Sequence, residues 1–243
     1  MSRHFMTIAG RIVRQIGRDR RTLALIIMVP VVMMTLIGLS FPDKSMLNYI
    51  APALLATFVL FFSFLITGIS FLRERSQGTM ERLMATPVSR LDVALGYLFG
   101  LSVFAILQTL IIFFFTIYVL DVTYQGELWQ ILVFQLIIIV GSVNLGIFTS
   151  TFARNEFQVI QFIPLIIMPQ VFLGGMLWPV EQMPDYLQWL ANALPLTYAV
   201  DGLREVMLAG KTLLDVWLDL AVLAGYTVIT SILAALTIRR NMG

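Results

Sequence analysis

The stretch LNYIAPALLATFVLFFSFLITGISFL, residues 47–72, contains no Asp, Glu, Lys or Arg. It is long enough to cross a hydrocarbon core, which takes about 20 helical residues. Prolines inside such a stretch distort a membrane helix without ending it, so we expect kinks at Pro30, Pro52, Pro164 and Pro169. Five more stretches share these properties: residues 23–41, 93–120, 128–153, 157–180 and 220–238. We therefore predict an all-α integral membrane protein with six transmembrane helices.

The composition agrees with a membrane protein and excludes several kinds of chemistry. The chain has 243 residues, of which 59% are hydrophobic and 12% charged, whereas soluble domains have roughly 25% charged residues. It has no cysteine and one histidine, His4, so thiolate sites are excluded. Because the six stretches hold no ionisable side chain, an ion-coupled transporter and an intramembrane protease are both disfavoured. The phosphate-binding pattern GxxxxGK[ST] is also missing, and we predict no catalytic residue, metal or cofactor for this chain.

The distribution of positive charge predicts the orientation in the membrane. With the N-terminus inside, only Lys44, Arg204 and Lys211 of the 16 basic residues lie outside. The positive-inside rule then places both termini in the cytoplasm, in a multi-pass plasma (inner) membrane protein.

Residues 1–22 predict a separate amphipathic helix. On a helical wheel one side is apolar and the other carries Arg11, Arg14 and Arg18. We expect an interfacial helix with its apolar stripe in the acyl boundary and its arginines near anionic lipid headgroups. A short anchor that orients the first span is an alternative, and both interpretations can hold. The apolar side consists of Phe5, Ile8, Ala9, Ile12, Val13 and Ile16.

Residues 73–92, RERSQGTMERLMATPVSRLD, connect the second and third spans on the predicted cytoplasmic side. Gly78 permits a turn, Thr79 can cap a short helix, and Pro87 disfavours helical geometry at the residue before it. Ser89 and Asp92 resemble a capping box at the start of the third span. The segment predicts a short cytoplasmic helix, and its charge alone would fit an ordinary connector equally well.

Residues 181–215, on the predicted outer side, contain two short apolar-faced helices. The first opens at Pro184 and is closed by Pro195, and the second runs from Thr197 to Ala209 and is closed by Gly210. Both are too apolar to stand free in water, so we expect them to dip into the outer leaflet or to cap the bundle.

Two motifs resemble those of the ABC type-2 permease family. ERSQGTMERLMATPVSR, residues 74–90, is similar to the signature loop of that family. GGMLWPVEQMPDYLQWLANALPLTYAVDGLRE, residues 174–205, is similar to its second hallmark, a glycine pair with spaced prolines and an Asp-x-x-Arg ending. Since the motifs stand between spans two and three and between spans five and six, the resemblance covers residues 1–243 as a single transmembrane domain.

The resemblance implies that residues 73–92 form a coupling helix docked on a separate ATPase subunit. Glu74 and Arg75 would brace that helix from the end of span two. The residues implied at or near the contact are Gly78, Thr79, Glu81, Arg82, Leu83 and Pro87.

The resemblance also implies an assembly of two permease subunits, identical or different, with two ATPases that bind ATP and Mg. Membrane lipids surround this assembly, and no nucleic acid takes part. The facing surfaces of spans two and five would form the route, with Phe64, Thr67, Gln161 and Gln170 as candidate pathway residues, although each side chain could equally tie helices together.

The resemblance implies export, because the family exports drugs and antibiotics, lipids and lipid-linked saccharides. Among these substrates, the uncharged spans favour an amphipathic or hydrophobic one over a bare ion. A membrane sensor or resistance module and a sodium-extruding permease are the alternatives.

Overall fold

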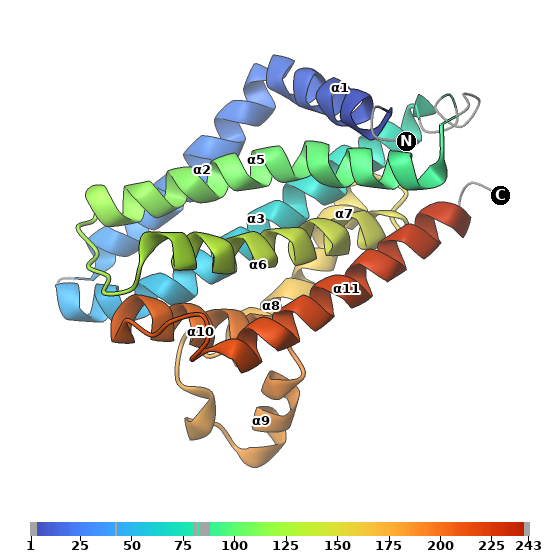
Figure 1. Cartoon of the computed structure of the whole chain (residues 1–243). Coiled ribbons are helices and arrows are strands. Elements are labelled where there is room, and N and C mark those ends of the chain that lie inside the picture. The colour runs from blue at the N-terminus through green and yellow to red at the C-terminus, as the bar shows by residue number, and fades with distance from the viewer. Residues whose placement is uncertain (1–3, 42, 80–81, 83–87, 241–243) are drawn as a thin grey trace.

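The computed structural model describes residues 4–41, 43–79, 82 and 88–240, and every regular element among them is a helix. Figure 1 shows these helices as one elongated bundle with both termini at the same end, called the termini end below. The elements are α1 (His4–Arg18), α2 (Arg20–Ser40), α3 (Lys44–Ser76), α5 (Arg90–Tyr118), α6 (Leu128–Ser150), α7 (Glu156–Phe162), η1 (Ile163–Ile167), α8 (Met168–Leu173), η2 (Val180–Gln182), α9 (Asp185–Asn192), α10 (Pro195–Ala209) and α11 (Trp217–Arg240).

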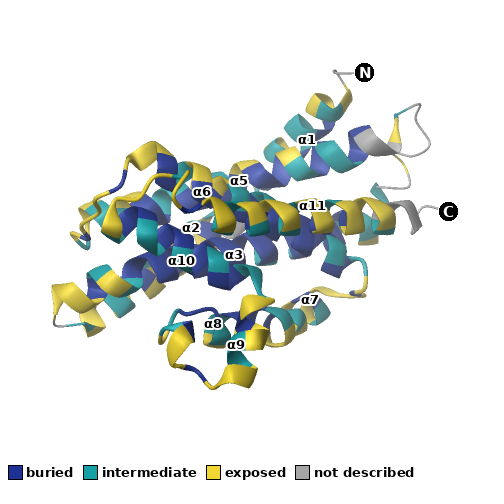
Figure 2. Ribbon diagram, turned by 60° about the horizontal axis from the view of Figure 1, so that its bottom comes forward, coloured by how far each residue is buried: buried dark blue, intermediate teal, exposed yellow. Residues whose placement is uncertain are grey.

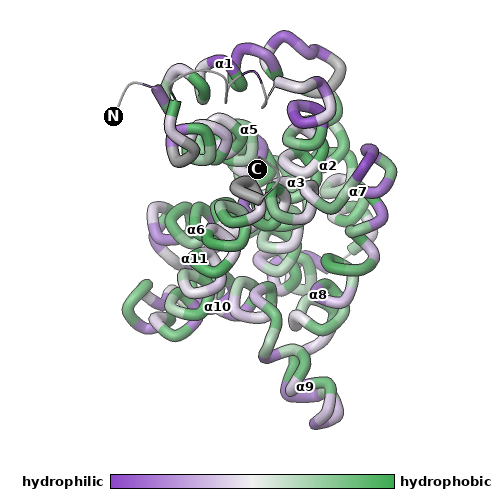
Figure 3. The backbone as a smooth tube through the Cα atoms, turned by 90° about the vertical axis from the view of Figure 1, so that its right-hand side faces the viewer, coloured by the Kyte–Doolittle hydropathy of each residue, from purple (hydrophilic) through white to green (hydrophobic). Residues whose placement is uncertain are grey.

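Within the described residues, six helical segments are long and apolar enough to cross a membrane, as predicted. Five are the single helices α2, α3, α5, α6 and α11, and the sixth combines α7, η1 and α8. Viewed toward the termini end, the long helices are mostly hydrophobic, with hydrophilic segments on α1 and at the start of α7 (Figure 3). The helices overrun several predicted stretches, and α3 continues past residue 72 to Ser76.

Helix α3 is the centre of the bundle. Of its most apolar window 83% is buried, against 17% for α2 and for α11, so most residues of those two apolar helices are not buried in the bundle. Figure 2 shows exposed residues along α11. Small residues let α3 and its neighbours approach closely. A Cβ on Gly146 of α6 would lie 2.8 Å from the carbonyl oxygen of Phe64, and one on Gly68 would lie 2.7 Å from Cγ1 of Val159.

Helix α1 packs on α5, and the prediction that its apolar stripe lies in the acyl boundary is wrong for the centre of that stripe. Ile8, Ile12 and Ile16 are buried. The hydrogens of Gly96 and Gly100 on α5 leave room for them, because a Cβ on Gly96 would lie 2.7 Å from Cβ of Ile8. The sequence predicts the amphipathic helix correctly, but another helix rather than lipid covers the centre of its apolar face.

The fifth span is distorted at its prolines and shorter than predicted. Pro164 lies in the π-helix η1 and Pro169 in α8, where neither can donate an N–H to the preceding turn. The predicted span continued to Val180, but the helix ends at Leu173. Gly175, with a φ of +75°, turns the chain there, a conformation that suits glycine. Pro30 and Pro52 lie inside the continuous helices α2 and α3.

The two short helices after the fifth span exist with shifted boundaries. Helix α9 ends at Asn192, and Pro195 is the first residue of α10 rather than the terminator of α9. Proline suits a first helical position because the missing N–H would have no partner there. Helix α10 ends at Ala209, and Gly210, with a φ of +64°, provides the predicted left-handed cap. Helix α9 projects from the bundle with exposed aromatic side chains such as Trp189 (Figure 2).

The contact between α1 and α5 yields a prediction. Gly96→Leu should displace α1 and lower the free energy of unfolding by about 1 to 3 kcal/mol, the usual cost of overpacking. The thermal unfolding midpoint of the detergent-solubilised chain measures this. Gly10→Ala is the matched control, since nothing lies within 4 Å of a Cβ at Gly10 and alanine favours a helix. Equal midpoints for Gly96→Leu and the parent chain would contradict the packing described.

Candidate functional site

The loop after α3 starts with the predicted turn. Helix α3 ends at Ser76, and Gly78 adopts a φ of +67°. Thr79 and Arg82 are helical, and the Arg82 N–H donates to the Gly78 carbonyl at 3.2 Å. Glu81, Leu83 and Pro87, which belong to the predicted coupling helix, lie outside the described residues. The loop ends at Ser89, whose Oγ accepts from the Asp92 N–H at 3.0 Å, as the capping pattern predicted.

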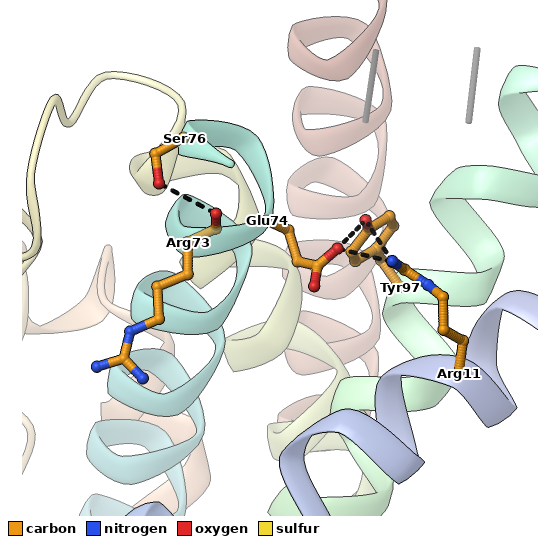
Figure 4. Close-up of polar contacts among 5 residues, drawn as sticks. All are labelled: Arg11, Arg73, Glu74, Ser76 and Tyr97. Carbon is orange, nitrogen blue, oxygen red and sulfur yellow. Dashed lines mark hydrogen bonds and ion pairs between the residues drawn. The ribbon is translucent and has the colours of Figure 1, made fainter. Parts of the chain in front are cut away.

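Glu74 ties α3 to α1 and α5. Its Oε2 accepts from the Arg11 guanidinium at 2.6 Å and from the Tyr97 hydroxyl at 2.8 Å, and Arg11 also donates to the Tyr97 oxygen at 3.1 Å (Figure 4). Glu74 is only 5% exposed, and a buried carboxylate without such donors would be costly. Burial works against the charge of Arg11, but Glu74 and Tyr97 keep the pKa of Arg11 above its ordinary value.

The residues on either side of Glu74 contact other parts of the bundle. Arg73 donates to both carboxylate oxygens of Glu156 at the start of α7, at 2.6 and 3.1 Å, and lies 3.9 Å from Asp19 between α1 and α2. Arg75 donates to the carbonyls of Thr151, at 2.6 Å, and Ala153, just beyond the end of α6. We call Arg73, Glu74 and Arg75 the anchor of the loop, because they hold its first residues to α1, α5, α6 and α7.

Sequence reasoning found Glu74 and Arg75 in the anchor and missed their partners. Arg11 was assigned to the lipid-headgroup side of α1, whereas its guanidinium contacts Glu74, 63 residues away. Tyr97 lies 23 residues from Glu74 and resembles any other aromatic residue of an apolar helix. The one available signal was Glu74 itself, a carboxylate directly after an apolar span, which needs a cation when it is buried.

The candidate pathway residues do not share one surface. Phe64 and Thr67 are fully buried, close to Gly146 of α6. Gln170 is also buried and donates to the carbonyl of Ile166 in its own turn, whereas Gln161 is exposed. A role of these four residues in transport stays a prediction.

The second motif forms a polar cluster at the opposite end of the bundle. Arg204 of α10 donates to the carbonyl of Gly175 at 3.0 Å, lies 3.7 Å from Asp201, and stacks over the ring of Tyr49 at 4.6 Å from its centroid. The glycine pair and the Asp-x-x-Arg ending therefore meet, and join the end of α8 to α10 and α3. Burial raises the pKa of Asp201 to about 6, against the opposing effect of Arg204.

Among the described residues, no group of three or more His, Cys, Asp or Glu side chains lies close enough to hold a metal ion. The polar clusters are instead small groups at the two ends of an apolar bundle. This architecture defines a multi-pass helical membrane protein whose charged clusters join helix ends.

The chain belongs to the ABC-2 type transporter family, whose model matches residues 3–208. It is 25% identical over 202 residues to ABC transporter G family member 20 of Dictyostelium discoideum, covering 82% of this chain and 28% of the relative. It is 26% identical over 194 residues to YbhR of Escherichia coli, described as a probable multidrug ABC transporter permease, and the match covers 80% of this chain and 53% of the relative. It is 25% identical over 161 residues to the linearmycin resistance permease protein LnrN of Bacillus subtilis, and the match covers 66% of this chain and 42% of the relative. The matches thus span about a quarter to a half of these relatives.

The anchor predicts strong coupling between Arg11 and Glu74. Each single change, Arg11→Gln or Glu74→Gln, should lower the free energy of unfolding by about 1.5 to 3 kcal/mol, as for a hydrogen bond to a charged group. The double variant should lose clearly less than the sum. Chemical or thermal unfolding of the four proteins measures the coupling. The Lys44–Asp121 pair is the control, because both side chains are more than two-thirds exposed, so solvent screens the pair and Asp121→Asn should change the stability far less. Additive losses at Arg11 and Glu74 would contradict the anchor.

Asp201 predicts a pH dependence with a definite sign. Because its pKa is raised from 3.8 to about 6 in the folded chain, the folded state holds a proton that the unfolded state releases. Stability should therefore fall as pH rises from about 4 to 6, and Asp201→Asn should reduce this decline. Unfolding midpoints across that pH range provide the measurement. Asp215 is the matched control of opposite sign, because hydrogen bonds from Thr212 lower its pKa and its contribution is lost as pH falls. An unchanged slope in Asp201→Asn would refute the assignment.

Proposed function

We propose that this chain is the transmembrane permease subunit of an ATP-driven ABC exporter, energised by a separate nucleotide-binding subunit. The observation that carries the proposal is the anchor, because a loop held to four helices can transmit a displacement of its outer residues to the whole bundle. Two ATPase copies and a second permease subunit would complete the complex, and the ATPases would bind ATP and Mg. Membership of the ABC-2 type transporter family supports this arrangement.

The coupling contact would lie on the part of the loop beyond the anchor. That part starts with the helical turn that contains Gly78, Thr79 and Arg82. The resemblance assigns Glu81, Leu83 and Pro87 to the same contact. Glu74 and Arg75 are engaged inside the bundle, so we assign them to bracing rather than to contact with the ATPase.

The substrate we propose is amphipathic or hydrophobic, such as a drug or antibiotic, a lipid or a lipid-linked saccharide. The uncharged spans support this class, and so do the names of the relatives, which mention multidrug transport and linearmycin resistance. The word resistance in the name of LnrN also favours a second candidate, a resistance module that acts by binding or extraction. Sodium extrusion is less well supported, because a sodium ion prefers carboxylate ligands.

The proposed orientation places the termini end in the cytoplasm and predicts opposite labelling of two exposed positions. Single cysteines at Gln77 and at Asn192 can be introduced without background, because the chain has no cysteine. An impermeant thiol reagent added to intact cells should label the cysteine at 192 and spare the one at 77. Equal labelling of both from outside would rule out the six-span topology.

The coupling loop is tested by Glu81→Ala and Arg82→Ala. Losing one partner of a charge pair buried at an interface costs about 2 to 5 kcal/mol, or roughly thirty-fold or more in affinity. Each variant should therefore weaken co-purification with the ATPase or uncouple hydrolysis from transport, with expression and permease dimerisation unchanged. The measurements are co-purification, and ATP-driven transport in vesicles with the proton gradient collapsed.

Gln182→Ala, an exposed change at the other end of the bundle, serves as the control and should alter neither property. If both loop variants match the parent chain in recruitment and coupling, the loop is a plain connector. If an uncoupler stops transport while ATP remains, the proposed energy source is wrong.

A further inference from the structure

A cavity of about 200 Å³ opens between α1, α3 and α5 at the termini end. Its volume is many times the roughly 15 Å³ that one water molecule needs. Asp19, Arg73 and Glu74 line it together with the apolar side chains of Ile12 and Leu101. A cavity with both charged and apolar walls fits the polar head of an amphipathic molecule better than water alone.

Glu74 has unused capacity to accept hydrogen bonds in this cavity. Arg11 and Tyr97 both donate to Oε2. Figure 4 shows the other carboxylate oxygen pointing away from both donors. A buried carboxylate oxygen attracts a donor that carries positive charge, since such a bond is about twice as strong as a neutral one.

Oε1 of Glu74 is the acceptor that the cavity offers to a cation. Arg11 donates to the other oxygen of the same carboxylate, and Arg73 is engaged with Glu156, so neither of these basic side chains donates to Oε1.

A basic groove adjoins the cavity along α1. It has a volume of about 580 Å³, and its lining includes Arg11, Arg14 and Arg18. Gln15 lines both the groove and the cavity, so the two are neighbours on the same helix. Arg11 is already paired with Glu74, so Arg14 and Arg18 are the arginines that the groove offers to an anion. The carboxylate of Glu74 on one side of Gln15 and these two arginines on the other match a ligand that carries an ammonium and a phosphate a few bonds apart.

The position along the membrane normal agrees with a lipid ligand. Asp19 lies just before Leu23, the first residue of the first span, and Arg73 lies in the last turn of α3. Both residues therefore lie where the apolar part of the bundle ends. Lipid headgroups occupy that level, and basic residues there are attracted to their phosphates.

We propose that the cavity and the groove together bind the headgroup of a zwitterionic aminophospholipid from the leaflet at the termini end. The primary ammonium donates to Oε1 of Glu74, and the phosphate lies on Arg14 and Arg18. A quaternary ammonium has no N–H to donate, so phosphatidylethanolamine should bind better than phosphatidylcholine. This binding needs neither ATP nor a partner subunit, so it stands or falls independently of the transport proposal.

The test is native mass spectrometry of the full chain, purified in detergent, with phosphatidylethanolamine, phosphatidylcholine and phosphatidylglycerol of identical acyl chains. The parent chain should retain phosphatidylethanolamine above the other two lipids. Glu74→Gln should weaken it about tenfold, as expected for the loss of one charge-assisted bond, and leave phosphatidylcholine unchanged. The double variant Arg14→Gln/Arg18→Gln should weaken all three lipids, because each contains a phosphate.

A second variant separates binding from folding. Ser70 lines the cavity and takes no part in the hydrogen bonds among Arg11, Glu74 and Tyr97, so Ser70→Leu should fill the space and abolish the preference with an unchanged unfolding midpoint. Glu181→Gln, at the other end of the bundle, should retain it. Equal retention of phosphatidylethanolamine and phosphatidylcholine by the parent chain would overturn the proposal. So would a folded Ser70→Leu chain that still prefers phosphatidylethanolamine.

Discussion

The buried carboxylate of Glu74 is the constraint on which the termini end depends. A carboxylate that is 5% exposed is costly to bury without donors, and Arg11 and Tyr97 are the donors here. This requirement holds α1 over α3 and α5 at one defined position. Arg73 extends the constraint to the start of α7, and Arg75 extends it to the chain just beyond the end of α6. Three consecutive residues of one helix thus set the positions of four others.

The proposed coupling role of the anchor depends on the central place of α3. Helix α3 is buried along most of its length, and it runs beyond the apolar span to carry the anchor residues. At Gly146 the backbone of α6 approaches that of α3, and at Gly68 the side chain of Val159 packs directly on the backbone of α3. The proposal requires a displacement of the anchor to pass through this close packing, because packed interiors have low compressibility. The polar cluster around Arg204 then links the other end of the same helix to α8 and α10.

Local patterns were sufficient to predict most of the helices, and contacts between distant residues were not. The six spans follow from apolar length, the turn at Gly78 from the freedom of glycine, and the start of α5 from the Ser89 cap. The partner of the α1 stripe did not follow, because an apolar stripe looks the same whether lipid or another helix covers it. The early end of the fifth span was missed as well, because hydrophobicity continues past Leu173 while the backbone turns at Gly175. At the candidate site, residue types identified Glu74, but only the fold brings Arg11 and Tyr97 to it.

The packing of α1 on α5 also bears on how the chain is made. Ile8 meets Gly96, a residue 88 positions later in the chain, so the ribosome finishes α1 long before its packing partner exists. At about 5 to 20 residues per second, the interval is roughly 4 to 18 s. During that time the apolar stripe of α1 needs another cover, and the surface of the bilayer provides one for an amphipathic helix. During synthesis, α1 can thus lie on the membrane surface until α5 is available. The docking of α1 on α5 completes the termini end only after the third span has been inserted.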